Sequence, residues 1–257
     1  MRMERKSFTS PSSSGSLRER AYAHIQRGIA AGVLKPDTAI SEVVLSRELK
    51  MSRTPIREAF SQLVAEGLLA QTPNRGTLVV RLQRQDVIEL YELREALEVY
   101  AVRKASQLPL RSADVERWEQ YSEEIAQLGK LLQKSSRKTL TSEQMRQFIE
   151  ADLNFHNMLM RISVHGRIHK VLNDTRLLIR IFGIERPEYD VAALEGIHQQ
   201  HADIISAVKN HEAELASNLL TKHIQISLQE RLQAYDSWER ERSFQKNLPE
   251  LFTASRT

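Results

Sequence analysis

From residue 85 to residue 235, apolar side chains recur every three or four positions, and this periodicity constrains the fold more than any other feature of the chain. The spacing is that of one face of an α-helix, and strand-like alternation is lacking. Prolines, glycines and polar runs separate the periodic segments, which predict helices at 86–107, 112–132, 142–163, 166–182, 192–210 and 212–235. Six amphipathic helices should pack into a bundle with an interior large enough for a ligand site.

The N-terminal part of the chain carries a different pattern, in which two helices are joined by a tight turn. Apolar spacing predicts helices at 17–31, 43–50 and 54–69. Ser52 can cap the third helix by accepting from its free N–H groups, and Pro55 fits its first turn. Arg53, Thr54 and Arg57 cluster at the same end, where the helix dipole attracts anions. This layout places base-reading side chains in a DNA major groove, although an ordinary capped surface helix would show the same capping residues.

A hairpin signal follows the third helix. Pro73-Asn74-Arg75-Gly76 stands between two short runs with β propensity, a pattern typical of a turn between antiparallel strands. Arg75 at the tip would lay a cation against phosphates or a minor groove. The predicted fold is therefore mainly α, with an N-terminal winged helix-turn-helix that has a small β wing, followed by an all-helical bundle of about six helices.

Charge divides the chain in the same way. Residues 1–85 hold 14 Lys and Arg against 7 Asp and Glu, whereas the remainder holds 23 against 26. A basic module joined to a mildly acidic remainder fits a nucleic-acid-binding domain attached to a second function. We expect a disordered arm at 1–15, a DNA-binding domain at 16–82, a helical effector and metal-binding domain at 83–238, and a C-terminal tail at 239–257.

Composition also limits the compartment. No stretch is long and apolar enough to be a transmembrane helix, and the Ser-rich start lacks the apolar run of a signal peptide. The chain has no cysteine, which excludes disulfides and thiolate metal ligands. We therefore expect a cytoplasmic protein that has no membrane partner.

Four polar residues on three of the predicted helices have the pattern of a metal site. Asp152 and His156 are four residues apart, which places a carboxylate and an imidazole on one face of a helix. His201 and His223 stand within the apolar faces of the last two helices. Three inward imidazoles and one carboxylate suit a divalent transition metal. The alternative is a set of buried histidines that are simply hydrogen-bonded.

Arg94 falls on the inward stripe of the first bundle helix, where an unpaired guanidinium is costly. One explanation is an ion pair with Glu98, which follows four residues later. The other is a bidentate clamp for the carboxylate of a bound effector, and Arg180, on an otherwise apolar helix, is a second candidate for that role.

The N-terminal segment closely resembles the DNA-binding domain of the GntR family of bacterial transcription regulators. The residues that carry the resemblance are Gly32-Val33-Leu34-Lys35-Pro36-Asp37, Ser52-Arg53-Thr54-Pro55-Ile56-Arg57-Glu58-Ala59, Leu63-Val64-Ala65-Glu66-Gly67-Leu68 and Arg75-Gly76-Thr77. The resemblance implies that Arg53, Thr54 and Arg57 contact an operator and that Gly76 lets the wing backbone approach DNA. Some members carry an operator-contacting arginine on the first helix of the motif, where this chain has Val43.

The C-terminal part resembles the all-helical FCD domain of the FadR-like branch of these regulators, and its six helices are similar to the VanR-like subgroup. The matching residues are Leu93-Arg94-Glu95-Ala96-Leu97-Glu98, Asp152-Leu153-Asn154-Phe155-His156, His201-Ala202-Asp203-Ile204-Ile205-Ser206-Ala207-Val208 and His223-Ile224. The resemblance implies that Asp152, His156, His201 and His223 bind one ion, with zinc as the first expectation and nickel or manganese as alternatives. The acidic residue that usually precedes the third ligand is Gln200 here.

These features together predict a ligand-responsive transcription regulator, by resemblance a repressor, and not an enzyme. Its partners would be a double-stranded DNA operator, a second copy in a homodimer, and a small carboxylate-bearing effector beside a divalent metal. One rival is a metal-dependent hydrolase fused to a DNA-binding module, but no motif such as His-Glu-x-x-His places a general base. Another is a constitutive DNA-binding dimer whose metal is purely structural.

Overall fold

The chain is described by a computed structural model that covers residues 16–30, 33–163, 166–181 and 188–247. The predicted arm at 1–15 and the last residues of the predicted tail, 248–257, lie outside the described residues. The chain divides into two compact units, Met1–Arg81 and Leu82–Thr257.

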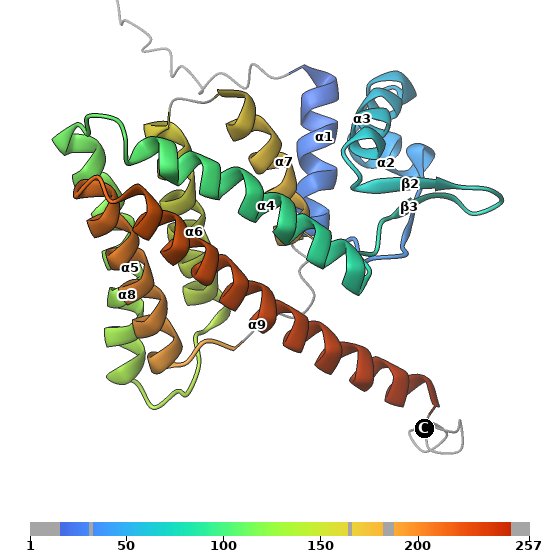
Figure 1. The fold of residues 1–257 in the computed structure, drawn as a ribbon. Helices are drawn as coiled ribbons and strands as arrows, with labels where there is room; N and C mark the ends of the chain where they lie inside the picture. The colour runs from blue at the N-terminus through green and yellow to red at the C-terminus, as the bar shows by residue number, and fades with distance from the viewer. Residues whose placement is uncertain (1–15, 31–32, 164–165, 182–187, 248–257) are drawn as a thin grey trace, which may run out of the picture. The chain divides into compact units, whose positions relative to one another are not determined.

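The first unit combines three helices with a small sheet (Figure 1). Its described elements are α1 (Leu17–Ala30), β1 (Ala39–Ile40), α2 (Glu42–Glu48), α3 (Arg53–Ala65), β2 (Leu69–Thr72) and β3 (Gly76–Val79). The sheet is antiparallel in the order β1-β3-β2, and Leu78 of the central strand pairs with Ala39 on one side and Ala70 on the other. Sequence periodicity did not predict β1, because a strand of two residues is too short to show alternation.

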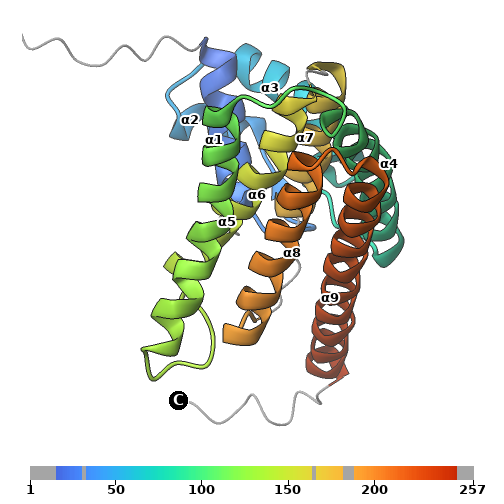
Figure 2. The same cartoon turned by 60° about the vertical axis from the view of Figure 1, so that its left-hand side comes forward.

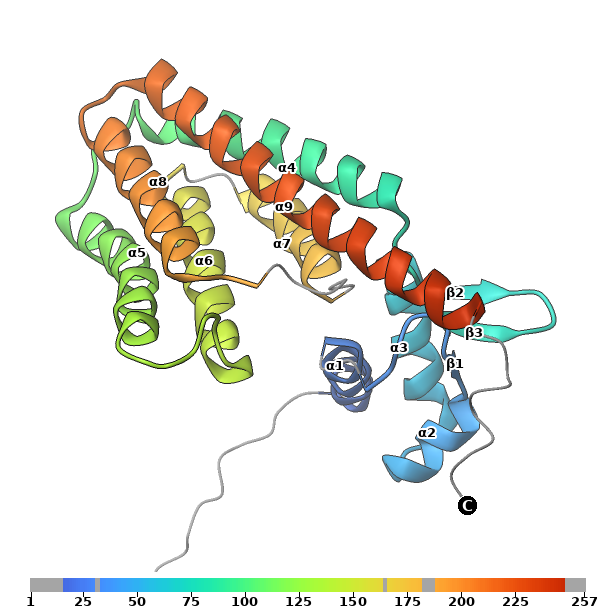
Figure 3. The ribbon, with the colours of Figure 1, turned by 90° about the horizontal axis from the view of Figure 1, so that it is seen from below.

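Helix α3 is the centre of this unit. It packs against both α1 and α2 (Figure 3), and its inward face buries Ile56, Phe60 and Leu63. The same periodicity that buries these residues leaves the opposite face of α3 exposed to solvent.

Helix α3 ends at Ala65, although the sequence predicted it to continue to residue 69. A Schellman turn stops it: the Gly67 N–H donates to the Val64 carbonyl and the Leu68 N–H donates to the Leu63 carbonyl. Gly67 has a φ of 74°, a backbone conformation that a Cβ would disfavour. Leu69, which the prediction placed in the helix, instead begins β2.

Within the described residues, the second unit is a bundle of six helices, as the periodicity predicted. They are α4 (Arg84–Ala105), α5 (Ser112–Gln133), α6 (Ser142–Ile162), α7 (Gly166–Ile181), α8 (Val191–Lys209) and α9 (Ala213–Asn247). Helices α4 and α9 run side by side (Figures 1 and 3), and α4 also packs on α6 and α7. Helix α8 lies between α5 and α9 (Figure 2). None of the described helices is both long and apolar enough to cross a membrane.

Local capping sets where the helices that carry the site begin. Helix α6 starts with a capping box, in which the Thr141 hydroxyl accepts from the Gln144 N–H and the Gln144 side-chain carbonyl accepts from the Thr141 N–H. Helix α8 is capped by Asp190, whose carboxylate accepts from the Ala193 N–H at 2.8 Å. These two caps fix the phase of the helices that present Asp152 and His201.

Helix α9 continues to Asn247, whereas the sequence predicted a helix to residue 235 and a tail from residue 239, with extension of the helix beyond Trp238 as the alternative. Two contacts lie in the added part of the helix: the Arg84 guanidinium on α4 pairs with the Asp236 carboxylate at 3.0 Å, and the rings of Tyr235 and Trp238 lie 6.0 Å apart. Charged residues that read as a tail are also good helix formers, so helix formation needed only a neighbouring helix to pack against.

We predict that Gly67→Ala lowers the free energy of unfolding by about 1–2 kcal/mol, because alanine is strained at positive φ. Gly67→Asn should cost less, since asparagine tolerates this conformation. Urea unfolding followed by circular dichroism measures both variants. Equal stability of Gly67→Ala and wild type would contradict the role assigned to the Schellman turn.

Candidate functional site

The structure brings together the four residues that the sequence named as metal ligands. Asp152 and His156 on α6, His201 on α8 and His223 on α9 each offer one ligand atom, and these atoms lie within 4.8 Å of one another. The three histidines are buried, whereas the Asp152 side chain is 32% exposed. The i, i+4 spacing on α6 presents Asp152 and His156 to the same side, and the packing of α8 and α9 supplies the rest.

His201 is the residue of this cluster whose environment is the most unusual. It is fully buried, yet neither of its ring nitrogens has a hydrogen-bond partner among the described residues. Its ring stacks flat on Phe155, with 3.5 Å between centroids, and its Nε2 lies 3.6 Å from the Asp152 carboxylate. Leaving a buried polar atom unsatisfied is costly, and a metal ion on the imidazole would remove that cost. The donor set therefore fits a metal better than it fits hydrogen-bonded core histidines.

Two other histidines are held in the tautomer that metal binding requires. The Nδ1–H of His156 donates to the Glu98 carboxylate at 2.7 Å, and the Nδ1–H of His223 donates to the Gln200 side-chain carbonyl at 2.8 Å. Their Nε2 atoms are left as acceptors and face each other at 3.3 Å. Such partners commonly orient metal-binding histidines. Gln200 thus supports His223 as a neutral acceptor.

Arg94 forms the ion pair that its spacing allowed. Its Nε donates to Glu98 Oε1 at 2.8 Å, and its Nη2 donates to His156 Nε2 at 2.7 Å. Burial alone would lower the pKa of the guanidinium, but the carboxylates of Glu98 and Asp152 and the phenol of Tyr91 together raise it above its ordinary value. Arg94 therefore stays charged although it is buried.

Glu98 is a site residue that sequence reasoning named only as an ion-pair partner. It is fully buried and accepts from both Arg94 and His156, so it links α4 to α6. Its position on the inward stripe of α4, four residues from Arg94, was the signal available in the sequence. The contact between Glu98 and His156 depends on how α4 packs on α6, which the sequence did not show.

Burial keeps the histidines neutral. Desolvation lowers the pKa of His156, with the Arg94 cation acting in the same direction against the opposing Glu98 carboxylate. Desolvation also lowers the pKa of His201 and of His223 well below their usual value, reinforced by the neighbouring imidazoles. Neutral imidazoles are the form that coordinates metal ions.

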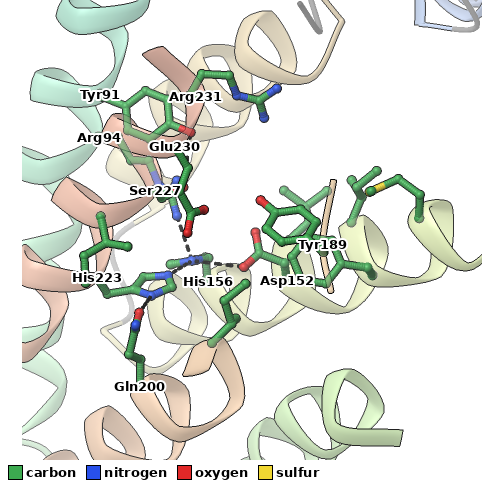
Figure 4. A pocket seen from close by; sticks show the side chains of 16 residues that line it. Tyr91, Arg94, Asp152, His156, Tyr189, Gln200, His223, Ser227, Glu230 and Arg231 are labelled. Carbon is green, nitrogen blue, oxygen red and sulfur yellow. Dashed lines mark hydrogen bonds and ion pairs between the residues drawn. The ribbon is translucent and has the colours of Figure 1, made fainter. Parts of the chain in front are cut away.

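A cavity of about 870 Å³, counting the part open to solvent, adjoins the cluster (Figure 4). Arg94, Asp152, His156 and His223 form its polar end. Further residues on its walls are Met145, Phe148, Ile149, Tyr189, Ile197 and Glu230. Arg180, the second candidate for an effector carboxylate, lies on α7, but its side chain is outside the described part of the structure.

The residues proposed to contact DNA lie on the solvent face of the first unit. Arg53, Thr54 and Arg57 are all exposed at the start of α3. The Arg57 guanidinium also pairs with the Glu42 carboxylate of α2, at 3.2 Å and 3.4 Å. Glu42 was not predicted as a site residue, because its contact with Arg57 depends on how α2 packs on α3.

Ser52 stands at the N-cap of α3, but its side chain makes no capping hydrogen bond, contrary to the prediction. A capping hydroxyl accepts from the N–H of the second or third helical residue. Pro55, the third residue, has no N–H, so one of these two donors is missing. The Ser52 side chain is exposed beside Arg53 and Thr54 instead.

The predicted wing is present as the β2–β3 hairpin. Asn74 and Gly76 both have positive φ, 61° and 76°, and the Arg75 N–H closes the turn on the Thr72 carbonyl at 3.1 Å. Arg75 is exposed at the tip, and a Cβ at Gly76 would meet no atom within 4 Å. Gly76 is therefore required by its backbone conformation, and no crowding within the unit demands it.

Known proteins match both units. Residues 17–79 match the family described as bacterial regulatory proteins, gntR family, and residues 89–226 match the FCD domain. The chain belongs to the GntR family, in the branch that carries an FCD domain. It is 31% identical over 192 residues to the Nta operon transcriptional regulator of Aminobacter aminovorans, an alignment that covers 74% of this chain and 83% of that protein.

Other GntR-family proteins extend this comparison. The HTH-type transcriptional repressor RspR of Escherichia coli is 26% identical over 211 residues, which cover 80% of this chain and 85% of RspR. The solved structure of E. coli McbR/YncC superposes with a TM-score of 0.66 at 22% identity, over 86% of this chain and 99% of that one. The structural match supports the fold.

The neutral histidines predict how stability changes with pH in this GntR-family chain when chelator keeps metal away. In the unfolded chain each histidine binds a proton below about pH 6.5, whereas the buried folded-state imidazoles resist protonation. The unfolding free energy should therefore fall as pH drops from about 7.5 to 5.5, by at most ~1.4 kcal/mol per pH unit for each histidine.

His201→Phe should make this slope shallower, because it removes one titrating group and keeps an aromatic ring beside Phe155. Urea unfolding at several pH values, with chelator present throughout, compares the two proteins. Identical slopes would contradict a depressed His201 pKa.

Proposed function

We propose that this chain is a transcription regulator, a repressor, that binds an operator as a homodimer through α3 and the wing and senses a small carboxylate-bearing effector beside a divalent metal. The observation that carries the proposal is the buried Asp152–His156–His201–His223 quartet at the end of a cavity lined by Arg94, in a chain that also has a GntR DNA-binding domain. Such a pairing of domains fits a sensor joined to a switch.

The DNA-binding part rests on the start of α3. Two arginines at i and i+4 share one exposed face, and a helix N-terminus adds its own attraction for phosphates. Arginine donors suit the edge of guanine in a major groove, and the cation on the wing suits phosphates or a minor groove. A two-fold dimer would present two such helices to two half-sites.

The metal would bind to the Nε2 atoms of the histidines and to the Asp152 carboxylate, and zinc, nickel or manganese suits this set. The lone pair of His156 Nε2 now accepts from Arg94 Nη2, so an ion and Arg94 compete for it. With His156 held by a metal, the Arg94 Nη2 donor would be available to an effector carboxylate, and Glu98 would keep Arg94 Nε in place.

Effector binding would change operator affinity through linked conformational states. A coupling of about 1–3 kcal/mol corresponds to a change of roughly 5–150-fold in affinity. The relatives support this role: RspR is named a transcriptional repressor, and the Aminobacter protein is named the regulator of an operon.

The DNA-binding role of α3 can be tested on an operator that the protein itself selects from random duplexes. If the arginine contacts a base, Arg53→Ala or Arg57→Ala should weaken binding to this operator by about 1–3 kcal/mol and leave binding to unrelated duplex nearly unchanged. If it contacts a phosphate, the substitution should weaken binding to both duplexes and reduce the salt dependence. Fluorescence anisotropy at two salt concentrations, on operator and on unrelated duplex, separates these outcomes.

Arg18→Ala is the matched control, since it removes an equally exposed arginine on the first turn of α1. Its operator affinity should stay near wild type. Wild-type affinity in both α3 variants, with their helicity intact, would reject α3 as the recognition helix.

The metal site can be tested by its effect on thermal stability. Because the ligands come from three helices, the ion should stabilise the bundle by about 3 kcal/mol at a hundredfold excess over Kd. Chelation should lower the melting temperature of wild type, whereas His201→Ala and His223→Ala should melt low already and respond little. His211→Asn, an exposed histidine with positive φ outside the cluster, should respond as wild type does. Protein that stays metal-free after incubation with zinc, nickel and manganese would reject the site.

A further inference from the structure

Glu230 is a carboxylate on the cavity wall that the metal quartet does not use. It lies on α9 two turns after His223, and Figure 4 shows its side chain directed into the cavity, while Arg231 extends away from the histidines. Among the described residues, the structure records no hydrogen bond and no ion pair to the Glu230 carboxylate. Its position on the same face of α9 as His223 follows from their spacing of seven residues.

A half-buried carboxylate without a partner is unfavourable. Burial raises the pKa of Glu230, and the nearby Asp152 carboxylate adds to this effect against the opposing Arg231 cation. A hydrogen-bond donor brought by a ligand would relieve the desolvation of this carboxylate, whereas an apolar or anionic group would worsen it. Glu230 therefore discriminates among ligands that all bind the metal through a carboxylate and differ in the rest of the molecule.

The charges around the metal-ligand candidates set how many carboxylates a ligand can carry. Arg94 and Glu98 cancel each other, the three histidines would bind a metal as neutral imidazoles, and Asp152 would offset half of the charge of a divalent ion. One positive charge remains, which one carboxylate neutralises. Arg231, the other cation that lines the cavity, extends away from the histidines, so a second carboxylate on the ligand would be opposed by Glu230.

We propose that the cavity selects a small monocarboxylate that bears a hydrogen-bond donor, a hydroxyl or an ammonium group, and that Glu230 is the residue that reads this donor. The inference rests on the proposed function, because the metal and Arg94 hold the carboxylate. It goes beyond that function by excluding dicarboxylates and simple alkanoates as preferred effectors. Glu230 acts by contact with the ligand and is not a metal ligand.

The test uses the zinc-loaded full-length protein and four acids that differ only at the far end: butyrate, γ-hydroxybutyrate, γ-aminobutyrate and succinate. The same four acids with one methylene more and with one methylene fewer are tested as well, to allow for the distance between the metal and Glu230. Isothermal titration calorimetry should show that the hydroxyl or ammonium acid binds at least about tenfold more tightly than the methyl acid and the diacid of equal length.

Glu230→Gln keeps the shape and removes the charge, so it should abolish the preference for ammonium and improve binding of the diacid. Glu195→Gln makes the same change in net charge at an exposed position on α8 and should keep the wild-type ranking. Native mass spectrometry confirms that each variant still holds zinc.

The outcomes separate the inference from the function beneath it. If the acids bind but rank alike in wild type and Glu230→Gln, or if the diacid binds most tightly to wild type, Glu230 does not read the ligand and only this inference fails. If zinc loads and no acid binds at any length, the carboxylate site of the proposed function fails with it.

Discussion

The buried carboxylate of Glu98 is the interaction on which the site depends. One oxygen holds Arg94 and the other holds His156, so a single side chain fixes a cation and a metal-ligand candidate on two different helices. Neither partner could be buried there alone: the guanidinium would be an uncompensated charge, and the imidazole would lose the group that sets its tautomer. The cavity, the histidine cluster and the packing of α4 on α6 are consequences of the same buried triad.

Much of the helical framework could be predicted from the sequence, because amphipathic periodicity and capping residues act locally. The predicted starts at 112, 142 and 166 agree with α5, α6 and α7. Three predictions were wrong in detail: the end of α3, the Ser52 cap and the end of α9. Gly67 ended α3 through its backbone conformation, and Pro55 removed one of the donors that Ser52 could have capped. The charged end of α9 is helical to Asn247, because charged residues such as Glu and Arg are themselves good helix formers.

The site divides along the same line. Arg94 with Glu98, and Asp152 with His156, are pairs at i and i+4, so helix geometry alone placed each of them on one face. His201 and His223 joined the cluster by their apolar surroundings and by resemblance to the FCD domain. Glu42, the Glu98–His156 contact and Glu230 were not found, since each depends on how one helix lies against another. Sequence patterns report which face a residue is on, but they do not report what that face meets.

Helix α9 carries His223 at the end of its first third and continues for 24 more residues to Asn247. At 1.5 Å per residue, that remainder is a rod of about 36 Å. A rotation of the helix axis by about 5° at His223 would displace the C-terminal end of the helix by roughly 3 Å. A long helix anchored at a binding site therefore acts as a lever arm, because the angle of its axis at that site determines the position of its far end.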